Sequence, residues 1–292
     1  MVAGELQRYL RLLGIRKPIA VDEAGLDEIV HRHLCRVPFE NVSKLLLLGR
    51  EGASRITALP EFLDGIEHHD LGGTCHTNNP FLASLLNALG YQADLLGADM
   101  NKPNVHTSIR VRLSGVEYHV DVGYGAPFRR AIRLDRLPWE LEQGRYRFVF
   151  DRASGPTSYQ ASVHCGGQRL HGYVVHPPAR EAAFFADEVI ESYRPGMTFT
   201  SMLRIIRFFD DYAADLEDTR LSIHRGGETT TKLLRNMTDC APQWPTTSPC
   251  PVARLKKPSP CWSNSPGEAC LRKRGRRARA DGPSPAISNA AH

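Results

Sequence analysis

The stretch Asp70-Leu-Gly-Gly-Thr-Cys-His-Thr-Asn-Asn-Pro80 places a glycine pair and a single cysteine directly before an apolar run. In that run apolar residues recur at helical spacing until Gly90, which predicts a helix over residues 81–89. A thiol near the start of a helix meets unpaired N–H groups and the positive end of the helix dipole, and both favour the thiolate. Cys75 is therefore a candidate nucleophile, although such a position also suits a small buried packing residue.

Pro80 leaves the start of this helix open between two positions. Proline is tolerated in the first turn of a helix but disturbs a helix interior, because its ring clashes with the preceding turn. If the helix begins at Pro80, Cys75 lies in the loop before it. If the helix begins at Cys75, Pro80 should kink it.

After Gly90 the apolar pattern changes from helical spacing to the alternation that is typical of strands. Two strands, over 105–113 and 116–122, flank Ser114-Gly115, a two-residue hairpin turn. Further short strands are expected over 92–97, 146–150, 159–163 and 172–175. The middle of the chain is therefore predicted to be an antiparallel β unit. Later segments fit a strand or a helix over 199–212 and a hairpin over 220–234.

The Ser114-Gly115 turn determines which residues face each other across the first hairpin. If the two residues that flank the turn pair with each other, His106 lies opposite Gly123 and diagonal to Asp121. Diagonal neighbours share a face and lie about 7–8 Å apart, so the carboxylate can hold one ring nitrogen of the imidazole. A shift of two residues would place His106 directly opposite Asp121, with the same consequence.

A cysteine near a helix start and a histidine held by an aspartate are what thiol nucleophilic catalysis requires. The histidine takes the thiol proton, the thiolate attacks a carbonyl, and the aspartate orients and stabilises the charged ring. Other interpretations stay open, because His106 also fits a satisfied strand histidine and Asp121 a turn cap. His119 shares the face of Asp121 and is a second candidate base. His76 is a third, although adjacent side chains on a helix are expected to point apart.

The residues before the Cys75 stretch are predicted to be mainly helical. Apolar spacing indicates helices over 5–13, 22–34 and 57–66 and a further apolar run over 42–48. Asp22 is placed to cap the second of these helices. Pro38 interrupts the pattern, and Arg36 and Glu40 stand on either side of the apolar trio around it. We expect these two residues to form a partly buried ion pair that fixes the turn.

Charge and cysteine content limit the function classes. The chain of 292 residues has a formal net charge of +5, but nine Lys and Arg against three Asp and Glu fall after residue 237, so the rest carries −1. A nucleic-acid partner is therefore not expected for the folded body.

Three dispersed cysteines in that body indicate a reduced compartment rather than a disulfide framework, and the four tail cysteines lack the Cys-x-x-Cys spacing of zinc sites. With no signal-like or membrane-length apolar run, we expect a cytoplasmic protein without a membrane partner. The oligomeric state stays open.

Four separated motifs carry a family resemblance: Arg36–Asn41, Gly72–Cys75, His106 and Val120–Gly125. The chain resembles the arylamine N-acetyltransferase family from about Gln7 to about Leu234. The order Cys, His, Asp matches, as does the fifteen-residue step from His106 to Asp121. The resemblance implies an α+β fold with a helical N-terminal domain, an antiparallel β-barrel domain and an α/β lid, built around a papain-like cysteine core.

The family resemblance also implies a reaction. An acetyl group passes from acetyl-CoA to the enzyme cysteine and then to an aromatic amine or hydrazine, with no metal. On this reading Cys75 is the nucleophile, His106 the base and Asp121 the orienting carboxylate. Four more positions match family contacts: Gly123 and Gly125 the glycine loop that the cofactor approaches, and Phe39 and Tyr124 the acceptor pocket. Ordinary packing would also explain the two aromatic residues.

The resemblance suggests four divisions of the chain: a helical domain with the nucleophile over 1–90, a β-barrel domain with His and Asp over 91–195, a lid over 196–237 and a basic Pro-, Ser- and Cys-rich tail over 238–292. The lid is expected to be incomplete, because nothing in the tail resembles the family's closing helix and strand. The composition of the tail is typical of disorder. It fits a lineage-specific extension as well as an altered reading frame.

Three substitutions depart from the family pattern: Leu12 and Leu71 stand where arginines are usual, and Thr77 where a glutamate is usual. The ionic partner of Glu40 is therefore open between Arg36 and Arg11. Two alternatives to the acetyltransferase hypothesis remain. One is a cysteine hydrolase or transglutaminase-like acyltransferase with the same triad, and the other is a catalytically impaired binding protein.

Overall fold

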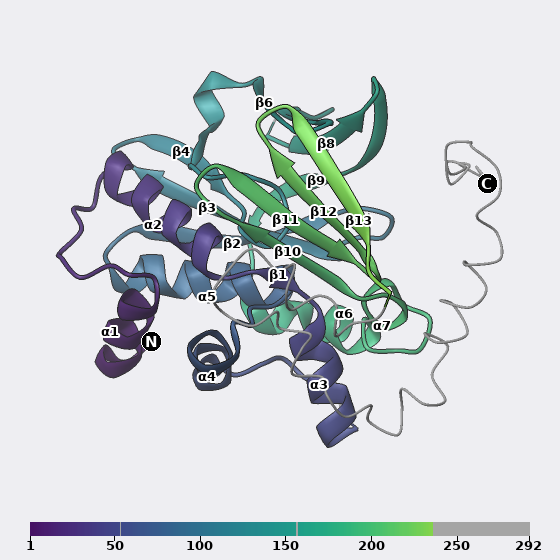
Figure 1. The fold of residues 1–292 in the computed structure, drawn as a ribbon. Coiled ribbons are helices and arrows are strands. Elements are labelled where there is room, and N and C mark those ends of the chain that lie inside the picture. Colours follow the sequence, from purple (N-terminus) through teal and green to yellow (C-terminus); the bar gives the residue numbers. More distant parts are fainter. Residues whose placement is uncertain (53, 156, 236–292) are drawn as a thin grey trace.

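The computed structural model describes residues 1–52, 54–155 and 157–235, and the predicted tail over 238–292 lies outside them (Figure 1). Five helices come first: α1 (Ala3–Leu12), α2 (Glu23–Arg36), α3 (Val42–Glu51), α4 (Leu59–His69) and α5 (Cys75–Ala88). They confirm the predicted helical start of the chain. Asp22 caps α2 as expected, because its side chain accepts a hydrogen bond from the N–H of Gly25.

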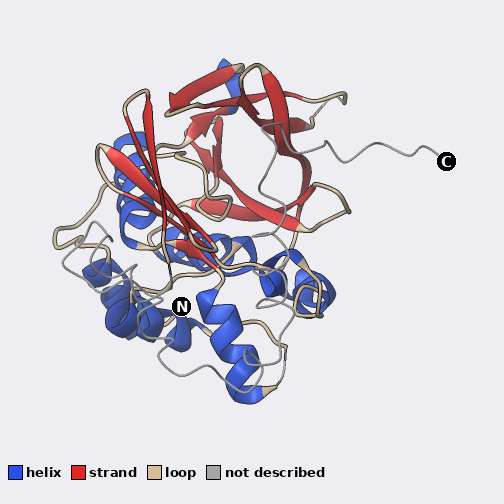
Figure 2. Ribbon diagram, turned by 45° about the vertical axis from the view of Figure 1, so that its right-hand side comes forward, coloured by secondary structure: helices blue, strands red, loops and turns tan. Residues whose placement is uncertain are grey.

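An eight-stranded antiparallel sheet follows, and it curls until it is nearly closed (Figure 2). Its spatial order is β5 (Ile132–Arg133), β4 (Val116–Val120), β3 (His106–Leu113), β2 (Gln92–Asp99), β9 (Gln168–Ala179), β8 (Tyr159–Cys165), β7 (Tyr146–Arg152) and β6 (Trp139–Gln143). The sequence pattern predicted six of these strands but indicated neither β5 nor β6. Inside the curl, buried aromatic and aliphatic side chains such as Phe128, Phe150 and Tyr173 form a core of their own.

A five-stranded sheet packs beside the barrel-like sheet, in the order β1 (Phe39–Glu40), β10 (Arg204–Phe208), β11 (Tyr212–Glu217), β12 (Arg220–Arg225) and β13 (Glu228–Leu233) (Figure 1). The segment 199–212, for which the sequence fits a strand or a helix, contains both, since α7 (Thr198–Ser201) precedes β10. The predicted hairpin is confirmed by the pairing of β12 with β13. Phe39 pairs with Ile206, so the chain segment before the cysteine stretch is bound to the C-terminal sheet.

The short helices η1 (Leu134–Arg136), η2 (Ala182–Phe185) and α6 (Ala186–Glu191) complete the described elements. Helix α5 packs against β2 and β3, which brings its first turn next to the start of β3. Among the described residues, none of the helices combines the length and apolar character that crossing a membrane requires.

Helix α5 begins at Cys75, which is one of the two starts that the sequence left open and lies six residues before the apolar run at residue 81. The helix therefore contains Pro80 in its interior. Buried side-chain hydrogen bonds hold the turn before the proline. The amide of Asn78 donates to the carbonyls of Pro38 and Gly73, and that of Asn79 donates to the carbonyl of Thr107. These tertiary contacts compensate for the backbone hydrogen bond that proline cannot donate.

The predicted ion pair between Arg36 and Glu40 is wrong. Arg36 donates instead to Asp70 Oδ1 at 2.7 Å and to the Ile66 carbonyl at 2.6 Å. Glu40 is fully buried and accepts hydrogen bonds from the N–H groups of Ser43 at 2.8 Å and Gly72 at 3.0 Å. Burial raises the pKa of Glu40, although these N–H donors oppose the rise. Backbone amides thus take the place of a cation, and Glu40 holds the glycine pair that precedes Cys75.

The alternative partner of Glu40 is also occupied elsewhere. Arg11 lies 3.6 Å from Glu67 on α4. This ion pair is on the surface between α1 and α4, where salt bridges contribute little to stability.

Candidate active site

Cys75 lies at the first position of α5 and is 7% exposed. Thr74 before it has extended backbone angles, so the helix starts at the cysteine itself. The first N–H groups of a helix have no partner within the helix and point along its axis toward the region where the thiol lies. The sequence-predicted nucleophile is therefore placed where a negative charge is stabilised.

His106 and Asp121 come together as the hairpin register predicted. Leu113 pairs with Val116, and the register places His106 at the start of β3, beside the residue that follows β4. His106 Nε2 donates to Asp121 Oδ2 at 2.8 Å, and the two side chains are 3% and 0% exposed. The imidazole is thus held at one nitrogen and free to act at the other.

Asp121 accepts hydrogen bonds from four donors within the protein interior. Besides His106, these are the Tyr173 hydroxyl at 2.7 Å, the Asn79 amide at 2.9 Å and the Gly123 N–H at 2.9 Å. Asn79 comes from α5, one turn after Cys75, so the helix that carries the thiol also holds the carboxylate. A carboxylate with this many donors is fixed in position and stabilised as the anion.

The pKa values of the three residues are strongly coupled. Burial alone would raise the pKa of the Cys75 thiol, but the imidazoles of His76 and His106 act through charge and hydrogen bonding to hold it well below its usual value. Burial opposes the charge on His106, yet the carboxylate of Asp121 and the thiolate of Cys75 raise its pKa. Burial would raise the pKa of Asp121, but His106, His119 and Asn79 together lower it. The arrangement favours a thiolate–imidazolium pair over a neutral thiol.

The other candidate bases have different surroundings from those expected. His119 donates from Nε2 to the Tyr173 hydroxyl at 3.0 Å, stacks on Phe150 at 4.3 Å, and is buried in the barrel core. His76 was expected to point away from Cys75, and this prediction is wrong. Its Nδ1 lies 3.4 Å from the Cys75 sulfur, so the two adjacent side chains are in contact.

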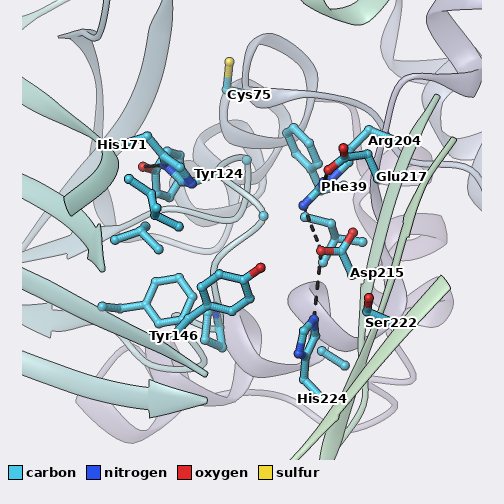
Figure 3. Close-up of a pocket in the computed structure, with 18 of the residues that line it drawn as sticks. Phe39, Cys75, Tyr124, Tyr146, His171, Arg204, Asp215, Glu217, Ser222 and His224 are labelled. Atoms are coloured by element: carbon cyan, nitrogen blue, oxygen red, sulfur yellow. Dashed lines mark hydrogen bonds and ion pairs between the residues drawn. The ribbon is translucent and has the colours of Figure 1, made fainter. Parts of the chain in front are cut away.

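A cavity of about 480 Å³ opens in front of Cys75, between the barrel-like sheet and the five-stranded sheet (Figure 3). Tyr124, Tyr146 and His171 line one side of it, and Phe39 lies on the other. All seven sequence-predicted site residues border this cavity or touch its lining: Cys75, His106, Asp121, Gly123, Gly125, Phe39 and Tyr124. A concave, largely aromatic space next to a reactive thiol is typical of a small-molecule site.

The sequence did not indicate the polar residues on the side of the cavity that the five-stranded sheet forms. Strands β10 to β12 carry them: Arg204, Asp215, Glu217, Ser222 and His224 (Figure 3). Arg204 donates to Asp215 Oδ2 at 2.8 Å, and His224 Nε2 lies 4.0 Å from the same oxygen. The signal that could have found them is the alternation of charged side chains along these strands, which places every second residue on one face.

The two glycines of the predicted cofactor loop are required by close packing. A Cβ on Gly123 would lie 2.5 Å from the Cα of Cys75 and 2.7 Å from the amide nitrogen of Asn79. Gly125 has a φ of +74°, and its Cβ would lie 2.7 Å from the side chain of Ile206. The loop therefore approaches the thiol more closely than any other residue type would allow.

Replacing Gly123 with alanine is expected to destabilise the protein by about 3 kcal/mol, because the added methyl displaces the backbone of α5 at Cys75. Urea denaturation measures this loss, and pH-dependent alkylation of Cys75 should show a less reactive thiol. Gly4→Ala is the matched control, since no atom lies within 4 Å of its Cβ position. Equal stability of the two variants would contradict the packing described here.

One group of potential metal ligands lies among the described residues, away from this cavity. His31, Cys35 and Asp210 bring one ligand atom each within 4.8 Å of one another. However, an N–H of Arg129 donates to the Cys35 sulfur at 3.5 Å, and a guanidinium beside the thiol opposes the binding of a cation.

Comparisons with known proteins agree with this geometry. A family model described as N-acetyltransferase matches residues 23–242, about three quarters of the chain. An arylamine N-acetyltransferase from Mycolicibacterium smegmatis is 26% identical over 241 residues, which are 78% of this chain and 85% of that protein. The arylamine N-acetyltransferase of M. tuberculosis has a similar fold, with a TM-score of 0.72 at 19% identity over 88% of this chain and 97% of that one. So does the Mycobacterium marinum enzyme in complex with CoA, with a TM-score of 0.68 at 20% identity over 82% and 90% of the two chains.

Proposed function

The chain belongs to the arylamine N-acetyltransferase family of acyltransferases, and from this premise we propose that it transfers acetyl groups from acetyl-CoA to arylamines or arylhydrazines in two steps. The observation that carries the proposal is the buried Cys75 thiol, which has a lowered pKa, neighbours the His106–Asp121 pair and faces an aromatic cavity. The catalytic residues are Cys75 as nucleophile, His106 as base and acid, and Asp121 as the orienting carboxylate.

In the first step the Cys75 thiolate attacks the acetyl carbonyl carbon of the donor thioester. A carbon–sulfur bond forms to Cys75, the bond to the CoA sulfur breaks, and the proton held by His106 leaves with the CoA thiol. The negative charge that develops on the carbonyl oxygen is stabilised by the N–H groups at the start of α5, which no side chain of the N-cap residue binds. The cavity admits the acetylated end of the donor along Gly123 and Gly125, which present no side chain to obstruct it.

In the second step the amine nitrogen of the acceptor attacks the acetyl group on Cys75. His106 takes the proton that the amine loses, and Cys75 departs as the thiolate. Aromatic side chains around the cavity suit a flat aryl ring, with Phe39 on the five-stranded sheet and Tyr124 on the barrel side. The hydroxyl of Tyr124 bonds His171 Nδ1 at 2.6 Å, which fixes the tyrosine ring beside His106.

The features of Cys75 favour this function over the alternatives raised by the sequence. If the chain were a binding protein without turnover, Cys75 would be expected to be no more reactive than the other cysteines. Burial instead raises the pKa of Cys35, whereas the pKa of Cys75 is lowered. A hydrolase would use the same triad with water as the acceptor, but an aromatic cavity favours an aryl acceptor over water.

The two-step order is tested by initial rates measured at several fixed concentrations of an aniline while acetyl-CoA is varied. We expect parallel lines in a double-reciprocal plot, because CoA leaves before the amine enters. Release of CoA without amine should stop after one equivalent. Intersecting lines would contradict the acetyl-enzyme route, and continued CoA release without amine would identify a hydrolase.

A further inference from the structure

His76 contacts the reactive sulfur directly. Its Nδ1 lies 3.4 Å from the Cys75 sulfur, a distance at which a thiolate accepts a hydrogen bond from a ring N–H. The ring is held in this position by Phe185 of η2, which packs against it with a centroid distance of 5.5 Å and an interplanar angle of 55°. The contact therefore does not depend on a freely rotating side chain.

A second, small cavity borders His76. It has a volume of about 30 Å³, enough for a single water molecule, and His76 is part of its lining. Most of the remaining lining carries hydrogen-bond donors: Ser43, Lys44, Arg55, Thr57, Thr74, Thr77, Ser192 and Tyr193. His76 Nε2 is buried and has no hydrogen-bond partner among the described residues.

The lining of this small cavity favours one tautomer of His76. Lys44 and Arg55 can only donate and the hydroxyls can donate or accept, so a lone pair at Nε2 has more possible partners in this lining than an N–H there would have. Since the proton of an imidazole is placed by the partner of the opposite nitrogen, this surrounding favours a proton on Nδ1. That proton points toward the Cys75 sulfur.

We propose that His76 is a second catalytic histidine, which donates a hydrogen bond to the Cys75 thiolate and keeps it ionised together with His106. The proposal rests on the proposed function of Cys75 as nucleophile. His106 supplies the proton transfers and is held by Asp121. His76 supplies a second donor to the sulfur, so the nucleophile has an imidazole on each of two elements, α5 and β3.

Charged groups from the neighbouring elements act in the same direction. On the barrel side the His106–Asp121 pair faces the thiol. On the α3 side Lys44 lies with its ammonium 4.4 Å from the centre of the Tyr193 ring, and it donates to Ser192. Burial lowers the pKa of Lys44 to about 8, while the Cys75 thiolate opposes that change. Arg55 lines the same small cavity. Arg55 is ion-paired with Glu51 and Glu61, so Lys44 is the cation that adds positive potential near the thiolate.

The test is the pH dependence of Cys75 alkylation by iodoacetamide, followed by peptide mass so that the other cysteines do not contribute. His76→Phe keeps an aromatic ring against Phe185 but removes the donor. We expect the midpoint of its profile to rise by about one pH unit, a tenfold smaller thiolate fraction below the midpoint. His76→Gln restores an N–H donor and should recover most of the shift. His69→Phe, on the exposed end of α4, is the control for a histidine-to-phenylalanine change.

The same substitution in a His106→Gln background tests independence of the two imidazoles. We expect His76→Phe to raise the midpoint further there, because His76 is then the remaining imidazole donor to the sulfur.

If His76→Phe does not fold, His76→Met serves as the second variant without a donor. A donor-free variant with the wild-type midpoint and an unchanged melting temperature would overturn the proposal. Because alkylation needs no acetyl-CoA, a protein that shows the shift but acetylates no arylamine would refute the proposed function and leave the role of His76 intact.

Discussion

Cys75→Ala is expected to abolish acetylation of arylamines, with a fall in rate of about 10⁵-fold or more. Both proposed steps form or break a bond to the Cys75 sulfur, so no part of the two-step route survives without it. The measurement is chromatographic detection of the acetylated amine at saturating acetyl-CoA. The variant should keep its fold, because alanine occupies less space than cysteine at the first position of α5.

Cys35→Ala is the matched control for this result. Cys35 lies on α2, where its sulfur contacts Arg129 and His31 rather than the cavity. Its loss should leave the rate within about twofold of wild type, as expected for a substitution away from the site. Substantial acetylation by Cys75→Ala, or a comparable loss in Cys35→Ala, would show that the nucleophile has been assigned wrongly.

Asp121→Asn is expected to lower turnover by about 10³- to 10⁴-fold while KM for the amine changes little. The substitution keeps the shape of the side chain but removes the negative charge that stabilises the imidazolium of His106. It also brings an amide N–H toward donors, since Asp121 accepts from His106, Tyr173, Asn79 and Gly123. The histidine then loses the partner that fixes its tautomer.

Steady-state kinetics and Cys75 alkylation should report this loss together. Less thiolate at neutral pH is expected, because an uncharged His106 no longer pairs with it. Tyr173→Phe removes only one of the four donors to Asp121 and is expected to cost about tenfold, within the range of a single hydrogen bond to a charged group. If Asp121→Asn, shown to be folded, turned over within tenfold of wild type, the carboxylate would have no orienting role.

The sequence predicted the relation between His106 and Asp121 because a two-residue turn leaves little freedom of register. Ser114 and Gly115 both have positive φ, at +51° and +79°, as such a turn requires. Once Leu113 and Val116 pair, alternation along the strands places the imidazole and carboxylate on one face. Local chemistry therefore determines this part of the site.

The start of α5 could not be predicted in the same way. Pro80 argues locally against a helix that begins at Cys75, and the contacts that overcome this come from distant segments, such as Thr107 and Pro38. Arg36 likewise bonds Asp70 and Ile66 rather than Glu40, four residues away along the chain. Side-chain direction at a helix terminus depends on neighbours in space, which also explains why His76 contacts the sulfur against expectation.

Only some of the residues that line the cavity could be identified from the sequence. Phe39 and Tyr124 were identified through motifs near the triad, and both line the cavity. Arg204, Asp215 and His224 belong to strands whose position over the site follows from the pairing of β1 with β10, a contact between segments more than 160 residues apart. No local pattern specifies such a pairing.

The most direct test of the acetyl-enzyme route is the mass of the intact protein and of its peptides after brief exposure to acetyl-CoA without an acceptor amine. We predict one acetyl group, located on Cys75, which disappears when an aniline is added and reappears on the aniline nitrogen. Acetylation of another residue, or an unmodified Cys75 in a folded protein that still acetylates the aniline, would contradict the account.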